Sequence, residues 1–260
     1  MKKTLEEYLK ITSNLNRPNA LDYIEYIFSD FIEMHGDRLF GDDESIVSGI
    51  GLLNDTPVTI LAQLRGKNIA DDLKYHHSMN YPEGYRKALR AMKQAEKFNR
   101  PIVCFIDTVG AFPGDFAEER GQSNAIAMNL MEMMYIKVPI ISVLIGTGGS
   151  GGALALSVAD KIIMLEYSTF GIISPKACAN ILWKDPSKEI EAAKLLKLTS
   201  DDLKKFGVVD KVISESGGAH NAPQSTARKI KSLIIKDLKE YKDISIDKLL
   251  ENRYNKFRHF

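Results

Sequence analysis

The chain has 260 residues, of which 44% are hydrophobic and 27% are charged, a composition typical of a folded protein with a sizeable core. Lysine and arginine (35) balance aspartate and glutamate (34) to a net charge of +1, so no long-range field favours nucleic acid or an anionic membrane as a partner. The two cysteines lie far apart, outside any CxxC pattern, which argues against a disulfide framework or a zinc site and predicts a reducing, cytoplasmic location.

The first part of the chain predicts a helix, two strands and a second helix. Residues 20–34 carry apolar side chains at helical spacing, which predicts a helix. Residues 46–53 and 57–64 are rich in Val, Ile and Leu, which predicts two strands joined by a short turn. A proline suited to the first helical turn then opens a predicted helix over residues 82–98.

A pattern of strand, glycine-rich segment and helix begins at residue 101 and repeats. Residues 101–107 and 138–145 are continuous apolar runs, which predicts strands covered on both faces in a mostly parallel α/β sheet. The glycine-rich segments that follow them are expected at the carboxyl edge of the sheet, where open α/β folds bind ligands. Residues 138–159 carry no charge, but their proline and five glycines favour strand, turn and helix over a membrane span.

The last third of the chain is predicted to be mostly helical. It is expected to be helical from Pro175 to about Phe206, to return as a strand at 208–214 and to end in two amphipathic helices over 226–257. No linker is long enough to separate independent domains, which predicts a single domain. That domain is expected to span 1–260, with N-terminal helices at 1–35, a core at about 36–215 and C-terminal helices at 222–257.

Eight of the 18 glycines fall between residues 110 and 152, and the densest cluster is Gly146-Thr-Gly-Gly-Ser-Gly-Gly152. Glycine lets backbone N–H groups face a cavity, and the helix behind adds a positive dipole end, so the segment is suited to negative charge. It lacks both a complete dinucleotide fingerprint and the Lys-Ser/Thr of a P-loop. A phosphate cradle, an oxyanion hole and close packing of the backbone are the three interpretations.

A second glycine segment, Asp107-Thr-Val-Gly-Ala-Phe-Pro-Gly114, follows the strand at 101–107. With one such turn after each of two strands, one N–H from each could converge on a single carbonyl oxygen. That pairing favours the oxyanion hole over the other two interpretations.

Three long blocks of sequence carry a resemblance to a known family. They cover residues 82–98, 105–133 and 137–175, and the motif HGDR at 35–38 accompanies them. Over about residues 20–220 the chain resembles the alpha subunit of bacterial acetyl-CoA carboxylase carboxyltransferase. The resemblance implies a crotonase-type (ClpP/crotonase) α/β fold of repeated ββα units, here with N- and C-terminal helical extensions.

The same resemblance implies an activity and partners. The activity is transfer of the carboxyl group from carboxybiotin, carried on a biotin carboxyl carrier protein, to acetyl-CoA, giving malonyl-CoA for fatty acid synthesis. Biotin carboxylase belongs to the same system, and a zinc-bearing beta subunit pairs with the alpha subunit in an α2β2 assembly. The lack of CxxC pairs is consistent with zinc in that partner, so no metal is expected in this chain.

The resemblance also implies site residues. In crotonase-type enzymes two such turns each donate an N–H, which implies one donor at Gly151 and the other at Gly110 or Ala111. The alpha subunit is implied to form mainly the biotin side of the active site. The oxyanion hole for the thioester is implied to come from the beta subunit. The implied set comprises catalytic Gly110, Ala111, Gly149 and Gly151 and substrate-binding Phe112, Gly114, Gly148, Ser150 and Gly152.

Four positions depart from the pattern usual in that family. Thr147 stands where glutamate is common, Val109 where proline is common, and Lys176 and Ala177 replace an acidic residue and a glycine. Thr147 and Lys176 shift the local charge from negative toward positive near the implied site. A diverged paralogue acting on another acyl-CoA is therefore an alternative.

Other motifs suggest other activities. Ser150 matches the G-x-S-x-G pattern of serine hydrolases, but no histidine occurs between His77 and His220 to act as its base. Glu118 and Glu119 are similar to the paired acids of a crotonase-type enoyl-CoA hydratase or isomerase, although a solvated first helical turn is the simpler interpretation. A partner-binding scaffold without catalysis is the remaining alternative.

Several clusters have plain structural interpretations. The histidine pair at 76–77 is expected at the surface, the HGDR motif at a helix end with an ion pair, and the methionine-rich residues 128–134 in core or interface packing. A basic face of the helix at 82–98 is expected to be solvated, with CoA phosphates or the carrier protein as alternative contacts; it comprises Arg86, Lys87 and Arg90.

Overall fold

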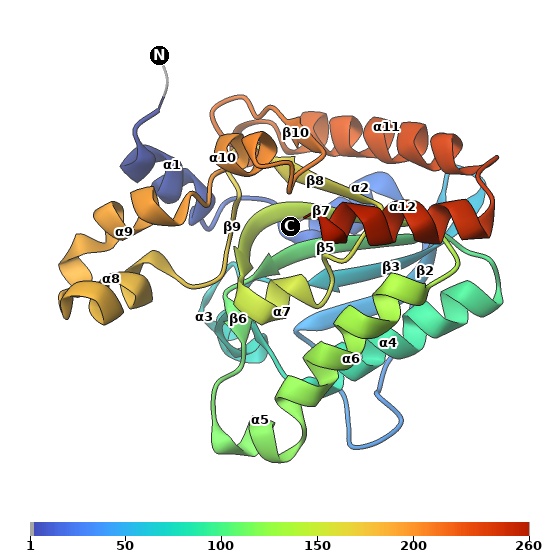
Figure 1. Ribbon diagram of the computed structural model, residues 1–260, viewed down its shortest axis with the longest axis horizontal. Helices are drawn as coiled ribbons and strands as arrows, with labels where there is room; N and C mark the ends of the chain where they lie inside the picture. Colours follow the sequence, from blue (N-terminus) through green and yellow to red (C-terminus); the bar gives the residue numbers. More distant parts are fainter. Residues whose placement is uncertain (1–2, 260) are drawn as a thin grey trace.

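The computed structural model describes residues 3–259 and contains one large sheet with helices on both faces (Figure 1). Its strands follow the order β1-β2-β3-β5-β7-β8-β10, β9 pairs with β7 off this path, and β4 and β6 form a separate pair. The strands are β1 (Ser29–Glu33), β2 (Ile46–Leu53), β3 (Thr56–Gln63), β4 (Met79–Asn80), β5 (Ile102–Thr108), β6 (Gly110–Ala111), β7 (Ile140–Gly149), β8 (Lys161–Leu165), β9 (Thr169–Gly171) and β10 (Lys211–Ile213).

The strand direction divides the sheet into two parts. The β1–β2 and β2–β3 pairs are antiparallel, whereas β3–β5, β5–β7, β7–β8 and β8–β10 are parallel. Strand β5 is buried along its whole length, as its continuous apolar sequence predicts for a strand covered on both faces. The expected mostly parallel α/β sheet is confirmed.

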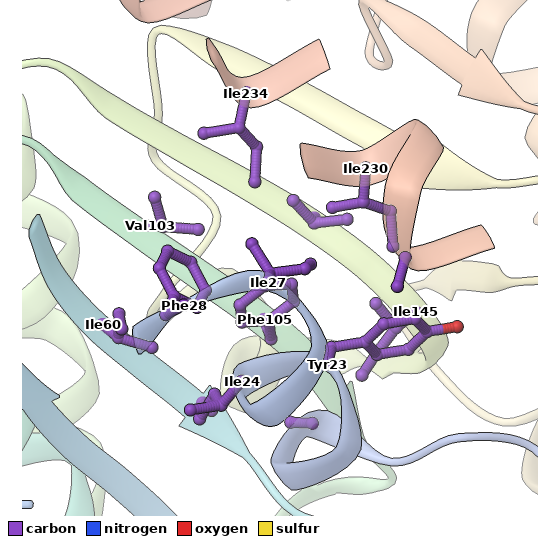
Figure 2. Packing of buried hydrophobic residues seen from close by; sticks show 14 of the residues in the cluster. Tyr23, Ile24, Ile27, Phe28, Ile60, Val103, Phe105, Ile145, Ile230 and Ile234 are labelled. Atoms are coloured by element: carbon purple, nitrogen blue, oxygen red, sulfur yellow. The ribbon is translucent and has the colours of Figure 1, made fainter. Parts of the chain in front are cut away.

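Two apolar clusters attach the helices to opposite faces of the sheet. On one face, α2 and α11 pack side chains such as Tyr23 and Ile230 against strand residues that include Phe105 (Figure 2). On the other face lie α4, α6 and α7. The helices are α1 (Leu5–Thr12), α2 (Ala20–Ile27), α3 (Ile69–Lys74), α4 (Pro82–Lys97), α5 (Asp115–Glu119), α6 (Gln122–Tyr135), α7 (Ser150–Leu154), α8 (Pro175–Trp183), α9 (Glu189–Leu196), α10 (Ser200–Lys205), α11 (Pro223–Tyr241) and α12 (Ile246–Arg258), with 3-10 turns at His76–Ser78, Pro186–Lys188 and Ala219–Asn221.

The structure of residues 20–34 differs from one sequence prediction. Helix α2 ends at Ile27, Phe28 is extended, and residues 29–33 form the edge strand β1. The prediction of a helix over 20–34, and of helices alone up to residue 35, is therefore wrong for this strand. Strand β1 pairs with β2, where Gly49 leaves room for the Phe31 ring. Apolar residues a few positions apart suit either structure, so their spacing could not separate the two.

The uncharged stretch at 138–159 forms a strand and a short helix, as predicted, but the boundary between them differs. Strand β7 continues through the glycines to Gly149, and α7 begins at Ser150. The expected turn at 146–152 is therefore confined to the junction of these two residues. Within residues 3–259, no helix combines the length and the apolar character needed to cross a membrane.

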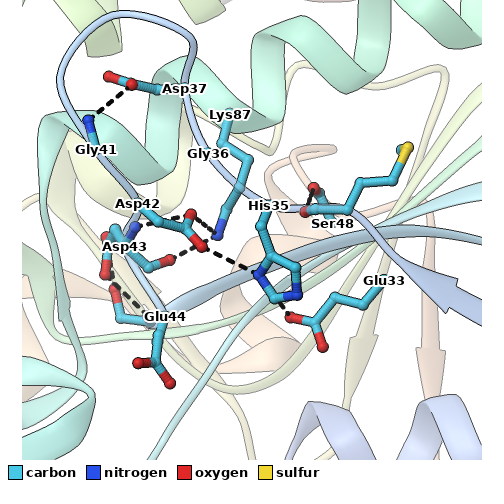
Figure 3. Close-up of polar contacts among 12 residues, drawn as sticks. Glu33, His35, Gly36, Asp37, Gly41, Asp42, Asp43, Glu44, Ser48 and Lys87 are labelled. Carbon is cyan, nitrogen blue, oxygen red and sulfur yellow. Dashed lines mark hydrogen bonds and ion pairs between the residues drawn. The ribbon is translucent and has the colours of Figure 1, made fainter.

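The basic face of α4 is not solvated as expected. Lys87 is fully buried, and its Nζ donates to Asp42 Oδ1 (2.5 Å) and to the carbonyl of Asp43 (2.8 Å) (Figure 3). Burial opposes the charge of Asp42, but hydrogen bonding led by Lys87 lowers the pKa of Asp42 to about 2. Arg86 Nε donates to buried Asp37 (2.8 Å). Lys87 therefore lies inside the protein and Arg86 is half-buried, and each of the two has an anionic partner.

The HGDR motif at 35–38 lies in the loop after β1 and not at a helix end. Asp37 Oδ1 accepts three backbone N–H groups within the loop, at 2.8 to 3.0 Å, from Leu39, Phe40 and Gly41; Figure 3 shows the bond from Gly41. Arg90 donates to the carbonyl of Gly36 (3.1 Å). Through these contacts and the Asp37–Arg86 pair, the loop is attached to α4.

Helix α12 is attached to the core by a buried ion pair. The guanidinium of Arg253 bonds both carboxylate oxygens of Asp160, at 2.9 and 2.7 Å. It also donates to the carbonyls of Met133, Ile136 and Val138, around the end of α6. One side chain thus connects the C-terminal helix to α6 and to the loops before β7 and β8.

We expect Arg253→Leu to lower the free energy of unfolding by about 3–5 kcal/mol, because it leaves the buried Asp160 carboxylate without its cation. Lys248→Leu, in the same helix, is the matched control, since Lys248 and its partner Glu251 are both more than half exposed and such pairs contribute little. Urea denaturation followed by circular dichroism measures both variants. Equal losses of stability would contradict the assigned role of Arg253.

Candidate functional site

The two glycine segments meet at the carboxyl edge of the sheet, as predicted. Thr108 at the end of β5 pairs with Gly148 in β7. A Cβ added to Gly149 would overlap the carbonyl of Val109, and one added to Gly152 would lie 2.6 to 2.7 Å from backbone atoms of Gly110 and Ala111. Only glycine allows the two backbones to come this close.

The backbone around β6 distinguishes the two candidate donors of the second segment. The Gly110 N–H donates to Thr108 Oγ1 (3.1 Å), and the Phe112 N–H donates to the carbonyl of Asn80 in β4 (3.0 Å). Val109 also donates to this side, at the carbonyl of Ser78 (3.0 Å), so of the two residues between Val109 and Phe112 it is Gly110 whose N–H already has an acceptor. Ala111 is therefore better placed than Gly110 to donate to a ligand.

The first turn of α7 supplies the other candidate donor. The N-terminal N–H groups of a helix have no partner within the helix, and Gly149 at the N-cap position has no side chain to accept from them. Gly151 lies in this turn, half-buried, and a Cβ there would make only an ordinary contact with Ile126 (3.6 Å). Ser150 turns the chain between strand and helix with a φ of 52°, in the left-handed region.

The remaining substrate-binding candidates extend from this junction. Gly148 is buried within β7, and Phe112 is half-buried with its ring 4.5 Å from that of Tyr81. Gly114 is exposed, at the start of α5, with a φ of 144°. The structure thus gathers the candidates of both segments around β6 and α7 and leaves Gly114 at the periphery.

Asp107 contacts the end of β7 next to the junction of β6 and α7, and it was not among the predicted site residues. It is buried at the end of β5 and accepts the Thr147 N–H (2.8 Å). Burial raises the pKa of Asp107, whereas Arg65, 3.9 Å away, works in the opposite direction. A Cβ on Gly146 would collide with this carboxylate. Its place directly after an apolar strand was the available signal in the sequence.

Glu118 and Glu119 lie in α5 and are exposed, and Glu118 accepts from Ser123 Oγ (3.1 Å). This placement agrees with the interpretation of a solvated turn. Arg120 points inward instead, donating to Glu83 (2.7 Å) and stacking on Phe116 at 3.7 Å.

The histidines do not assemble catalytic or metal-binding groups near the junction. His76 meets Tyr81 edge to face with the ring centroids 4.3 Å apart, and His77 bonds Asp72 (2.6 Å). His220 lies 3.5 Å from the amide nitrogen of Asn14, so it provides no base for Ser150. Among residues 3–259, no group of three or more His, Cys, Asp or Glu side chains is arranged to hold a metal ion.

Comparison with known proteins gives consistent matches. The family model described as acetyl co-enzyme A carboxylase carboxyltransferase-like matches residues 3–260. The protein named acetyl-coenzyme A carboxylase carboxyl transferase subunit alpha of Clostridium perfringens is 55% identical over 251 residues, which cover 96% of this chain and 93% of that protein. The protein of the same name from Bacillus cytotoxicus is 54% identical over 250 residues, which cover 96% of this chain and 77% of that protein.

Solved structures confirm the crotonase-type α/β fold. A transcarboxylase 12S structure with methylmalonyl-coenzyme A bound matches with a TM-score of 0.70 at 21% identity, over 88% of this chain and 44% of that one. This chain therefore spans less than half of the transcarboxylase chain. A Pseudomonas malonate decarboxylase hetero-tetramer in complex with coenzyme A matches with a TM-score of 0.67 at 17% identity. The match covers 85% of this chain and 89% of that one. At these identities the likeness concerns the fold.

We expect Gly152→Ala to destabilise the protein by about 1–3 kcal/mol, because the new methyl group must push the β6 backbone away from α7. Gly151→Ala is the matched control one residue earlier, where the added carbon makes an ordinary contact. Thermal unfolding of both variants measures the difference. The same melting temperature in the two variants would contradict the close approach of the two segments.

Proposed function

Since the chain belongs to the acetyl-coenzyme A carboxylase carboxyltransferase family, we propose that its paired glycine segments form a site for carboxyl transfer from carboxybiotin to acetyl-CoA. The product is malonyl-CoA for fatty acid synthesis, and the expected location is the cytoplasm. The observation that carries the proposal is the meeting of β6 and α7, where the backbone of Ala111 lies against Gly152, the residue after Gly151.

The chemistry requires stabilisation of transient negative charge. The bond between the biotin nitrogen and the carboxyl carbon breaks, a bond from that carbon to the acetyl methyl carbon forms, and the methyl proton goes to the departing biotin nitrogen. Negative charge develops first on the ureido oxygen and then on the thioester oxygen. Backbone donors of Ala111 and Gly151 suit the ureido oxygen, because fixed N–H dipoles stabilise an oxyanion without side-chain chemistry. Thioester stabilisation is assigned to the beta subunit.

Exposed apolar side chains beside the junction support a covering partner. Val109 and Leu154 flank the two turns and are 47% and 37% exposed, and Ile172, after β9, is 81% exposed. We propose that the zinc-bearing beta subunit of an α2β2 assembly covers this region. The biotin carboxyl carrier protein, loaded by biotin carboxylase, then presents carboxybiotin between the subunits.

We further propose that residues 1–260 act as a single carboxyltransferase domain. Thr12 Oγ1 of α1 donates to the carbonyl of Tyr167 beyond β8 (2.8 Å), and Arg253 ties α12 to the loop before β8. Contacts from both ends of the described chain to one sheet support a single unit. Residues 1, 2 and 260 lie outside the described part.

The complex formed by co-expression with a CxxC-bearing beta subunit is expected to carry out malonyl-CoA-dependent carboxylation of biocytin, the reverse reaction. Gly151→Val is expected to lower this turnover at least about 100-fold, because its branched side chain crowds the donor. Gly41→Val is the matched control, since a Cβ at Gly41 meets no atom within 4 Å. Circular dichroism checks that both variants fold.

Three results would contradict the proposal. Full activity of the isolated chain would exclude an essential contribution of the beta subunit. Hydration of crotonyl-CoA by the isolated chain would favour a hydratase, and preference of the complex for a larger acyl-CoA would favour a diverged paralogue.

A further inference from the structure

We propose that Gln63 is a positioning residue that fixes the spacing between the two oxyanion donors, an inference that rests on the proposed function. Gln63 is the last residue of β3 and is fully buried. It touches no reacting group. Its side-chain amide instead bridges α7, which contains Gly151, and β4, the strand that pairs with Ala111 in β6.

The bridge consists of two hydrogen bonds from one nitrogen. Gln63 Nε2 donates to the carbonyl of Gly152 in α7 (2.8 Å) and to Asn80 Oδ1 in β4 (2.8 Å). A single rigid amide group therefore contacts α7 directly and β6 through its paired strand β4.

On the β6 side, Asn80 connects the Gln63 amide to Ala111. Asn80 pairs with Ala111 in the β4–β6 ladder, and its carbonyl accepts the Phe112 N–H (3.0 Å) and Gln122 Nε2 (2.8 Å). Its side-chain nitrogen donates to Ser45 Oγ (2.8 Å). With its side chain and backbone both engaged, Asn80 holds the strand that carries Ala111 in place.

On the α7 side, the helix is too short to satisfy the Gly152 carbonyl in the usual way. An α-helix would bond this carbonyl to the N–H of residue 156, but the Leu156 N–H donates to Ala153 (3.2 Å). Gln63 supplies a donor from outside the helix. The Tyr85 hydroxyl adds a bond to Asn80 Oδ1 (3.4 Å) and lies 2.7 Å from where a Cβ on Gly152 would be.

Gln63 supplies a donor to two buried acceptors and leaves its own side-chain oxygen unpaired. Its Oε1 is buried without a hydrogen-bond partner among the described residues, and an unpaired buried oxygen is unfavourable. An apolar side chain of the same length would remove that cost but would leave the Gly152 carbonyl without its donor. The amide is therefore assigned to the geometry of the site, where donors misplaced by about 1 Å lower the rate strongly.

Gln63→Met in the complex with the beta subunit is the first test. It keeps the length of the side chain and removes both hydrogen bonds, so kcat for biocytin carboxylation is expected to fall about 10- to 100-fold. The KM for malonyl-CoA is expected to change less than about twofold, because substrate contacts are untouched. A merely structural role would lower the melting temperature and leave kcat per folded complex unchanged.

Asn129→Leu is the matched control. Asn129 is also a buried amide with an unpaired oxygen, and it donates to the carbonyl of Ala155 (3.3 Å), beyond the donor turn. Its kcat is expected to equal that of the wild type. An equal loss of kcat in both variants would contradict a specific role of Gln63.

Gln63→Glu gives a readout that does not depend on absolute stability, and it decides the matter if Gln63→Met fails to assemble. When protonated, the carboxyl can donate one of the two bonds, whereas the ionised form repels both acceptor oxygens. Turnover relative to wild type is therefore expected to fall as the pH rises. A constant ratio would contradict the bridge.

The outcomes separate the two proposals. Lack of turnover in the wild-type complex would contradict the proposed function. An active wild-type complex together with Gln63 variants of unchanged kcat would contradict only the positioning role.

Discussion

The contact between two stretches of backbone at the carboxyl edge of the sheet determines much else in this structure. Gly149 lies against the Val109 carbonyl and Gly152 against the backbone of Gly110 and Ala111. Neither contact leaves room for a side chain, so these glycines are required by distance rather than by an unusual φ. The contact brings β6 beside the first turn of α7, and the polar groups around it serve to hold that arrangement.

Buried charge holds the surrounding loops. Lys87 with Asp42, Arg86 with Asp37 and Arg120 with Glu83 connect α4 to the loop after β1 and to the turn after α5. Each pair joins elements far apart in sequence, and removing Asp42 would leave the fully buried Lys87 without its carboxylate partner. The near-neutral net charge therefore includes many charges matched internally, and a site built from N–H dipoles needs no excess of lysine or arginine.

The sequence identified the regular core because that core follows local rules. Strands β2, β3, β5 and helix α4 agree with the predicted ranges, since continuous apolar runs and a proline in the first turn leave few alternatives. The edge strand at 29–33 was missed because its short apolar pattern suits a helix equally well. The buried state of Lys87 could not be predicted, because its partner Asp42 lies 45 positions away. Gln63 gave a weaker signal still, as one polar residue in an apolar run, and its partners appear only when the chain is folded.

The proposed backbone donors depend on the glycine backbones and not on the side chains around them, which differ from the family pattern at several positions. Thr147 replaces the glutamate common in the family, yet its N–H is held by buried Asp107, a contact that does not depend on the Thr147 side chain. Val109 replaces a proline, and its side chain is 47% exposed, so the substitution alters the surface around the hole. Lys176 lies exposed near the start of α8. These three departures therefore change the surroundings and leave the paired glycine backbones intact.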